Sequence, residues 1–185
     1  MALRATFKVQ AFIVGPFPER IFSIEFCSKR IPSLILIFDS NTPISLKMDF
    51  RKITVQAEIL VAKSKAWEYY TLPDHIVKWN FASDEWHCPG ASNELVVGGT
   101  FSTRMEAKFG DIGFDFGGIY TEVRLQEGFT YKLPDDREVT VNFFEKEEHT
   151  RVQVIFDAET ENTLTLQKQG WQTLLNQYKK YTEAN

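Results

Sequence analysis

The sequence predicts an α+β fold in which a curved antiparallel sheet packs around one long C-terminal helix. Short segments of alternating apolar and polar residues follow one another from about residue 94 to residue 156, as consecutive antiparallel strands do. The apolar period becomes helical from about Thr163 onwards. A sheet and a helix that each carry one apolar face are expected to cover each other. The expected order is one strand, two short helices, six strands and the long helix.

The first strand and the two short helices precede this series. Residues 53–61, ITVQAEILV, alternate and are typical of a strand. Residues 65–70 are predicted to form a helix capped by Ser64, because a serine side chain accepts a hydrogen bond from the first turn. A second helix is predicted over residues 73–79, where Pro73 suits the first turn.

Residues 98–123 are expected to form a long central hairpin whose strands share one apolar face. Side chains along a strand point alternately to its two faces, so residues two apart lie together. Gly110 and Gly113 are expected to bracket the turn, where glycine adopts positive φ at little cost. Arg104, Glu106 and Asp115 have the polar parity and are expected to form exposed cross-strand pairs. The apolar parity consists of Phe101, Thr103, Met105, Ala107, Phe114, Phe116, Gly118 and Tyr120.

The rest of the sheet is predicted from shorter segments. A loop is expected over residues 80–93, followed by a short strand at residues 94–97 that leads into the hairpin. After the hairpin, alternating strands are expected at residues 129–133, 139–143 and 152–156. Strands this close in sequence pair with their neighbours and therefore run antiparallel.

The final helix is expected to present one continuous apolar stripe to the sheet. Gly170 lies in the middle of this helix, where glycine costs roughly 1 kcal/mol relative to alanine. It indicates a close approach of another backbone, space left for a ligand, or an exposed glycine that is simply tolerated. The stripe consists of Leu164, Trp171, Leu174, Leu175 and Tyr178.

The composition favours one domain, residues 48–185, preceded by an extension, residues 1–47. The chain has 185 residues, 43% hydrophobic and 14% aromatic, enough to build a sizeable core. Residues 1–47 carry six Lys and Arg against three Asp and Glu, whereas the whole chain has a net charge of −4. The acidic charge therefore lies in residues 48–185, which argues against a nucleic-acid partner because nucleic-acid binding needs a basic face.

The extension allows three interpretations. Met48 begins a stretch that looks like a natural start of the domain, so residues 1–47 are expected to be an upstream segment of uncertain structure. The alternatives are a targeting peptide, which two prolines interrupt, and an added element such as a hairpin or a partner-binding arm. No apolar run reaches the ~18 residues of a membrane span. Cys27 and Cys88 have no local spacing motif and suggest free thiols in a reducing, cytoplasmic compartment.

Several segments of the sequence resemble a known protein family. The chain from about Met48 to Asn185 is similar to the activator of heat-shock-protein-90 ATPase homologue-like proteins. They are a branch of the START-like (SRPBCC), birch-allergen-like helix-grip superfamily, which also holds polyketide cyclases and lipid carriers. The matching segments are Ala66-Trp67-Glu68, Trp79, ELVVGGTFSTRMEAK at 94–108, GFDFGGIYTEV at 113–123 and QGWQTLLNQYKKYTE at 169–183.

Two segments depart from the family pattern. Members usually have Asp-Leu-Arg where this chain has Glu94-Leu95-Val96, so a typical arginine is absent. Many have Asp-Gly where this chain has Phe109-Gly110, which would put an aromatic side chain at a hairpin tip as a contact point. The resemblance implies a helix-grip fold with a cavity between the sheet and the C-terminal helix that holds a small hydrophobic molecule.

The functional hypothesis is therefore a binding module without a cofactor. Ligand sites are mostly apolar, so the expected ligand-binding residues come from the aromatic parity and the helix stripe. These residues are Trp86, Phe101, Met105, Phe114, Phe116, Tyr120, Trp171, Leu174, Leu175 and Tyr178.

Two other function classes remain open. One is protein interaction, through a homodimer or through a chaperone such as the one that the eponymous activator acts on. The other is a polyketide-cyclase-like enzyme, which would need a buried acid or base, and no catalytic residue is identifiable. His87 and Cys88, with Asp84 and Glu85, are too close together in sequence for a metal site, since metal ligands come in separated pairs.

Overall fold

The computed structural model describes residues 12–14, 21–24, 34–37, 50–147 and 149–185. The chain divides into two compact units, Met1–Arg51 and Lys52–Asn185. The first contains an antiparallel sheet in which β2 (Ile21–Ile24) pairs with both β1 (Phe12–Val14) and β3 (Leu34–Ile37).

Most of the predictions for residues 1–47 fall outside the described residues, and so does the predicted free thiol of Cys27. Because only three short strands of this unit are described, the interpretation of residues 1–47 as an upstream extension stays a prediction.

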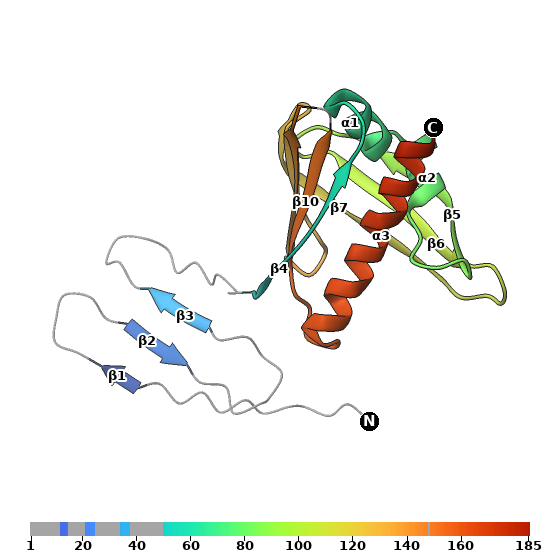
Figure 1. The fold of residues 1–185 in the computed structure, drawn as a ribbon. Helices are drawn as coiled ribbons and strands as arrows, with labels where there is room; N and C mark the ends of the chain where they lie inside the picture. Colours follow the sequence, from blue (N-terminus) through green and yellow to red (C-terminus); the bar gives the residue numbers. More distant parts are fainter. Residues whose placement is uncertain (1–11, 15–20, 25–33, 38–49, 148) are drawn as a thin grey trace. The chain divides into compact units, whose positions relative to one another are not determined.

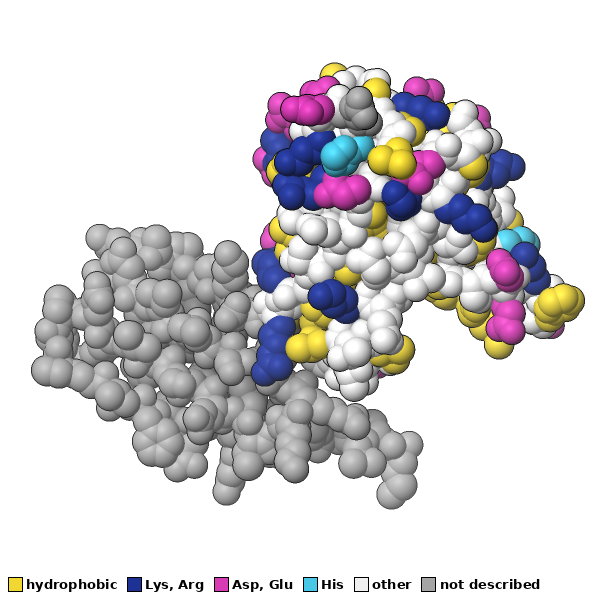
Figure 2. All heavy atoms as spheres, in the orientation of Figure 1, with side chains coloured by type: hydrophobic (Ala, Val, Ile, Leu, Met, Phe, Trp, Pro, Cys, Tyr) yellow, Lys and Arg dark blue, Asp and Glu magenta, His cyan; other side chains and the backbone are white. Residues whose placement is uncertain are grey.

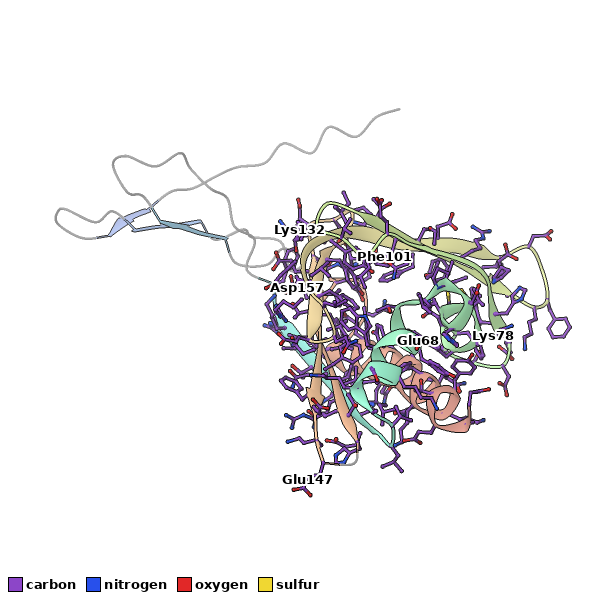
Figure 3. The ribbon with its side chains drawn as sticks, turned by 90° about the horizontal axis from the view of Figure 1, so that it is seen from above. Glu68, Lys78, Phe101, Lys132, Glu147 and Asp157 are labelled. Carbon is purple, nitrogen blue, oxygen red and sulfur yellow. The ribbon has the colours of Figure 1, made fainter. Side chains whose placement is uncertain are left out.

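The second unit is a seven-stranded antiparallel sheet with α3 (Leu164–Ala184) against its inner face. Figure 1 shows α3 crossing the sheet, and the view from above in Figure 3 shows the sheet bent around the helices, with Phe101 on its inner side. The strand order is β4-β10-β9-β8-β7-β6-β5. This architecture confirms the predicted α+β helix-grip fold. The other elements are α1 (Lys63–Thr71), α2 (Pro73–Trp79), β4 (Lys52–Ile59), β5 (Trp86–Asn93), β6 (Thr100–Ala107), β7 (Gly113–Arg124), β8 (Gly128–Lys132), β9 (Glu138–Glu145) and β10 (Thr150–Asp157).

The register of β6 and β7 confirms the predicted apolar face. Thr103 lies opposite Phe116, and Met105 lies opposite Phe114. On the other face Arg104 pairs with Asp115, with 3.5 Å between Nη1 and Oδ2. The turn differs from the expectation, because Gly110 has a φ of 90° whereas Gly113 begins β7 without a positive φ.

The strand before the hairpin lies earlier than predicted. Residues 86–93 form β5, where a loop was expected, and residues 94–97 form the turn that follows it. β5 is an edge strand that pairs with β6 alone, and a bulge interrupts this pairing between His87 and Gly90. Hydrogen bonds between backbones define this strand, and its apolar and polar side chains do not alternate. The alternation used to predict strands therefore could not identify it.

The helix starts were predicted less well than the helix bodies. α1 begins at Lys63 with Ala62 at the N-cap, so Ser64 lies inside the first turn and caps nothing. α2 has Pro73 in its first turn and ends at Trp79, as predicted. α3 is capped by Thr163, whose side chain accepts a hydrogen bond from the Leu166 amide.

The apolar stripe of α3 is fully buried only in the second half of the helix. Leu175 is 3% exposed and Tyr178 is fully buried, whereas Leu164 at the start of the helix is 41% exposed. Gly170 is exposed, and a Cβ added there would meet no atom within 4 Å, so the structure supports the interpretation of an exposed, tolerated glycine.

Polar side chains of α3 cover the free edge of β4. Gln172 Nε2 donates to the Gln56 carbonyl at 3.1 Å, and the Leu60 amide donates to Glu183 Oε1 at 2.7 Å. These bonds satisfy backbone groups that an edge strand otherwise leaves open. They also hold α3 across the sheet, at the position where it closes one side of a cavity.

Candidate functional site

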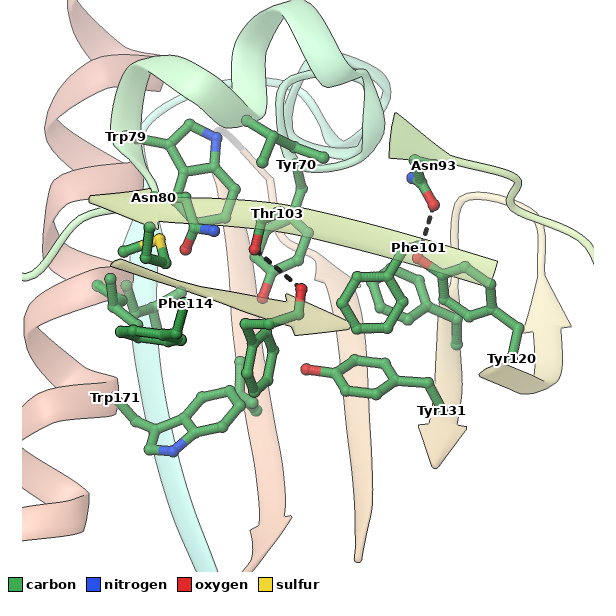
Figure 4. A pocket seen from close by; sticks show the side chains of 17 residues that line it. Tyr70, Trp79, Asn80, Asn93, Phe101, Thr103, Phe114, Tyr120, Tyr131 and Trp171 are labelled. Atoms are coloured by element: carbon green, nitrogen blue, oxygen red, sulfur yellow. Dashed lines mark hydrogen bonds between the residues drawn. The ribbon is translucent and has the colours of Figure 1, made fainter. Parts of the chain in front are cut away.

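A cavity of about 230 Å³ lies between the inner face of the sheet and the helices. Seventeen residues line it (Figure 4); they come from α1, α2, α3, β5, β6, β7, β8 and β10, except Asn80, which directly follows α2. Ligand pockets usually measure ~300–1,000 Å³, so this one suits a small molecule of one or two rings. The lining consists of Tyr70, Ile76, Trp79, Asn80, Asn93, Phe101, Thr103, Met105, Phe114, Phe116, Tyr120, Phe129, Tyr131, Val154, Trp171, Leu174 and Leu175.

The cavity brings together eight of the ten residues predicted from the sequence to bind a ligand. They come from one hairpin face and one helix stripe, two patterns that are visible in the sequence. Their role in ligand binding stays a prediction. The eight are Phe101, Met105, Phe114, Phe116, Tyr120, Trp171, Leu174 and Leu175.

The two other predicted residues lie outside the lining. The Trp86 ring packs edge-on against Phe114, with 5.8 Å between centroids. Tyr178 lies in the core behind the cavity, and its hydroxyl donates to the Ala66 carbonyl at 2.6 Å. Tyr178 therefore joins α3 to α1, and its helical spacing alone could not distinguish this role from cavity lining.

Several lining residues were not predicted from the sequence as binding candidates. Phe129 and Tyr131 lie two apart on β8, so their shared parity could have identified them. Tyr70 and Trp79 lie on the two short helices, and Asn93 ends β5, where no sequence pattern indicated a site.

Aromatic rings form most of the cavity wall. Phe101 contacts Tyr131 edge-on at a centroid distance of 4.6 Å, and Trp171 lies 6.1 Å from Phe116. Trp171 also stacks on Phe156 of β10 at 4.4 Å. These contacts fix the rings, so the wall is held in place by the core rather than by a ligand.

The polar residues of the lining are three tyrosines, two asparagines and Thr103. The Tyr120 hydroxyl donates to Asn93 Oδ1 at 2.8 Å, and Asn93 Nδ2 in turn donates to the Thr71 carbonyl at 2.6 Å (Figure 4). The hydroxyls of Tyr70 and Tyr131 make no hydrogen bond to any residue that the structure describes.

The cavity is electrically neutral. None of its 17 lining residues, all within the described part of the chain, is Asp, Glu, His, Lys or Arg. Burial is the main cause that raises the pKa of Tyr70, Tyr120 and Tyr131. The neighbouring phenols of Tyr70 and Tyr120 raise the pKa of Tyr131 further, so the three side chains are protonated at neutral pH.

The residues weighed as metal ligands do not converge. The Cys88 thiol is buried and donates to the Gly90 carbonyl at 3.4 Å, and its burial raises its pKa. His87 Nε2 instead lies 3.6 Å from Glu106 Oε2 at the surface. Within the described ranges no group of three His, Cys, Asp or Glu side chains could hold a metal ion.

The end of the β6–β7 hairpin projects from the body of the protein and is apolar. Phe109 is 85% exposed and Ile112 is 68% exposed, while Phe114 at the cavity edge is 51% exposed. Figure 2 shows hydrophobic side chains at this projecting end, next to charged ones. The exposure of Phe109 agrees with its predicted place at a hairpin tip.

None of the helices in the described residues is long and apolar enough to span a bilayer. Even α3, with 21 residues, carries charged and amide side chains along its length.

The chain is similar in sequence and fold to several known proteins. No curated protein matches the chain. The AHSA1-like protein from Aeromonas hydrophila is 42% identical, with a TM-score of 0.69 over 72% of this chain and 93% of that one. A protein from Cytophaga hutchinsonii is 45% identical, with a TM-score of 0.64 over 72% and 93%. A protein from Nitrosomonas europaea, 19% identical, shares the fold with a TM-score of 0.62 over 72% and 94%.

The model of one family matches residues 61–183, which include α1, α2, most of the sheet and nearly all of α3. The family is described as activator of Hsp90 ATPase homolog 1-like protein. This match and the 42% identity over most of a solved structure agree with the resemblance found in the hairpin and in the last helix. The chain belongs to the activator of Hsp90 ATPase homolog 1-like family, within the START-like superfamily.

Proposed function

We propose that this protein binds a small hydrophobic molecule in the cavity between the sheet and α3. The observation that carries the proposal is the cavity itself, about 230 Å³ of space walled by fixed aromatic rings. Protein interiors are otherwise close-packed, and unfilled apolar space costs stability. A ligand ring that buries ~150 Å² of apolar surface there gains ~4 kcal/mol before the costs of association.

The lining favours binding over catalysis. Acid–base catalysis near neutral pH works best with a group whose pKa lies close to that pH. The titratable groups in the lining are tyrosines, and burial raises the pKa of each of them further above its ordinary value, which already lies far above neutrality. A polyketide-cyclase-like reaction would therefore have to proceed without a matched acid or base from the cavity wall.

The test is a titration of the purified chain with prodan, a neutral naphthalene ketone whose fluorescence reports its surroundings. Leu174→Trp fills part of the cavity and is expected to weaken binding about tenfold, or ~1.4 kcal/mol. Leu166→Trp is the matched control, because Leu166 lies on the same helix, is 55% exposed and does not line the cavity. Equal affinity of the two variants would refute the proposal, and native mass spectrometry of the chain as purified would identify any ligand already bound.

We place this activity in residues 48–185 and propose that residues 1–47 are not needed for it. Every residue of the cavity lining lies between Tyr70 and Leu175, inside the unit Lys52–Asn185. A cytoplasmic location is supported by the free thiol of Cys88, because such thiols persist in reducing compartments.

A protein contact is a second candidate function, favoured by the exposed tip of the β6–β7 hairpin. An aromatic side chain that is 85% exposed at the end of a projecting hairpin suits insertion into a partner's pocket. The partner would be a second copy of the chain or, as the family's description suggests, a chaperone ATPase. Light scattering and a chaperone ATPase assay test both. A monomer with no effect on ATP turnover, unchanged by Phe109→Ser, would remove this candidate.

A further inference from the structure

Two tyrosine hydroxyls in the cavity have no hydrogen-bond partner among the residues that the structure describes. Tyr131 extends from β8 and is 6% exposed, and Tyr70 extends from α1 on the other side of the cavity. In Figure 4 the Tyr131 phenol points across the cavity. Neither hydroxyl bonds to any residue within the described ranges, whereas the third cavity tyrosine, Tyr120, is satisfied by Asn93.

Neither hydroxyl oxygen is among the fully buried, unsatisfied atoms of the described residues, so both reach the open space of the cavity. A buried polar group without a partner costs about 1–3 kcal/mol, and buried tyrosine hydroxyls usually find one. The surroundings of Tyr131 offer rings instead, with Phe101 at 4.6 Å and Phe129 at 6.3 Å between centroids. The two open hydroxyls therefore form a polar spot on a mainly apolar wall, and the space of the cavity must supply their acceptor, either water or a ligand.

The chemistry of the spot selects the type of partner. A carboxylate would lose its hydration without meeting a cation, because no Lys, Arg or His lines the cavity. An ammonium ligand would likewise find no Asp or Glu there. A carbonyl oxygen is neutral and has two lone pairs, so one oxygen can accept from Tyr70 and from Tyr131. A ligand hydroxyl has one proton and could donate to only one of them.

On the basis of the proposed function, we infer that the ligand is a neutral, largely aromatic molecule whose carbonyl oxygen accepts hydrogen bonds from Tyr70 and Tyr131. The ring stacks among the aromatic side chains of the wall, and the carbonyl fixes its orientation. The high pKa of both phenols agrees with this role, because each keeps its proton at neutral pH.

Three probes that share one ring system test this inference on the full chain. Prodan carries a ketone, dimethylaminonaphthalene lacks it, and dimethylaminonaphthoic acid replaces it with a carboxylate. The ketone is expected to bind about tenfold to a hundredfold more tightly than the parent, which is the value of two neutral hydrogen bonds. The carboxylate is expected to bind more weakly than both.

The variants Tyr70→Phe and Tyr131→Phe keep each ring and remove the hydroxyl. Each is expected to lower prodan affinity by about threefold to tenfold while the affinity for the parent stays unchanged, which also shows that the cavity remains folded. Tyr69→Phe is the matched control, because Tyr69 neighbours Tyr70 in sequence but stacks on His75 outside the lining.

The outcomes separate this inference from the proposal that it rests on. If the parent binds and the ketone binds no better, the inference is overturned and hydrophobic binding in the cavity stands. A ketone preference that survives both phenylalanine substitutions also overturns it, since the hydroxyls would then not be the donors. If none of the three probes binds, both proposals fail together.

Discussion

The substitution Tyr178→Phe separates core stability from ligand binding at a position that the sequence marked as a binding residue. Tyr178 is fully buried, and its hydroxyl donates to the Ala66 carbonyl at 2.6 Å. Its ring packs edge-on against Tyr70 at 4.9 Å and against Trp79 at 5.2 Å, and both of these side chains line the cavity.

The magnitude follows from what phenylalanine removes. The ring and its two contacts stay, so the cost is that of one buried hydrogen bond, about 1 kcal/mol. For the unit Lys52–Asn185 this corresponds to a fall in Tm of ~3–5 °C. Tyr178→Ala also removes the ring and is expected to cost ~3–5 kcal/mol.

Urea denaturation measures the change as a lower midpoint at an unchanged slope. The prodan titration is repeated on the same sample, and its affinity is expected to stay the same because no lining atom is lost. A Tyr178→Phe protein with wild-type stability and weakened dye binding would refute the assignment of Tyr178 to the core. That result would instead support the role predicted from the sequence.

Three further predictions concern pH, the extension and two glycines. Burial raises the pKa of the core tyrosines Tyr70, Tyr120, Tyr131 and Tyr178. Their contribution to stability is therefore complete below the unfolded pKa of about 10 and is lost as the pH rises above it. Phenolate absorbance should show no more than two of the six tyrosines ionising before the protein unfolds, and ionisation of the others in the folded protein would contradict the burial. A chain that starts at Met48 is expected to keep the Tm and the dye affinity of the full chain, and a large loss of either would show that residues 1–47 belong to the domain. Gly170→Ala is expected to raise the free energy of unfolding by up to ~1 kcal/mol, since open space surrounds this helical position. Gly118→Ala is expected to lower it, because a Cβ there would meet the Lys132 carbonyl and the Phe101 ring, and equal melting temperatures of the two variants would contradict this account.

Much of the fold could be predicted because its signals are local. Alternation in β6 and β7 placed Met105 and Phe114 on one face, and the structure pairs them across the hairpin. The helical stripe placed Trp171 and Leu175 towards the sheet. Both patterns follow from the fixed geometry of strands and helices, in which the spacing of residues decides which side they face.

The site could be predicted only in part. Trp86 has the aromatic character of a lining residue, yet it lies on an edge strand whose position depends on pairing with β6. Tyr178 and Leu175 lie on the same apolar stripe of α3. Tyr178 nevertheless packs in the core rather than at the cavity, because α1 lies against it and accepts its hydrogen bond. A period in sequence gives the face of an element, and it does not give what packs against that face.

By itself the sequence determined the family, the order of the elements and the apolar faces that form the inner surface of this protein. Only the tertiary structure decided that Tyr70 of α1 and Tyr131 of β8 share a cavity, with their hydroxyls bonded to no residue of the described ranges. The physical reason is that a cavity is the volume that packing leaves unfilled. That volume depends on the distances between elements far apart in the chain, which no local pattern of residues encodes.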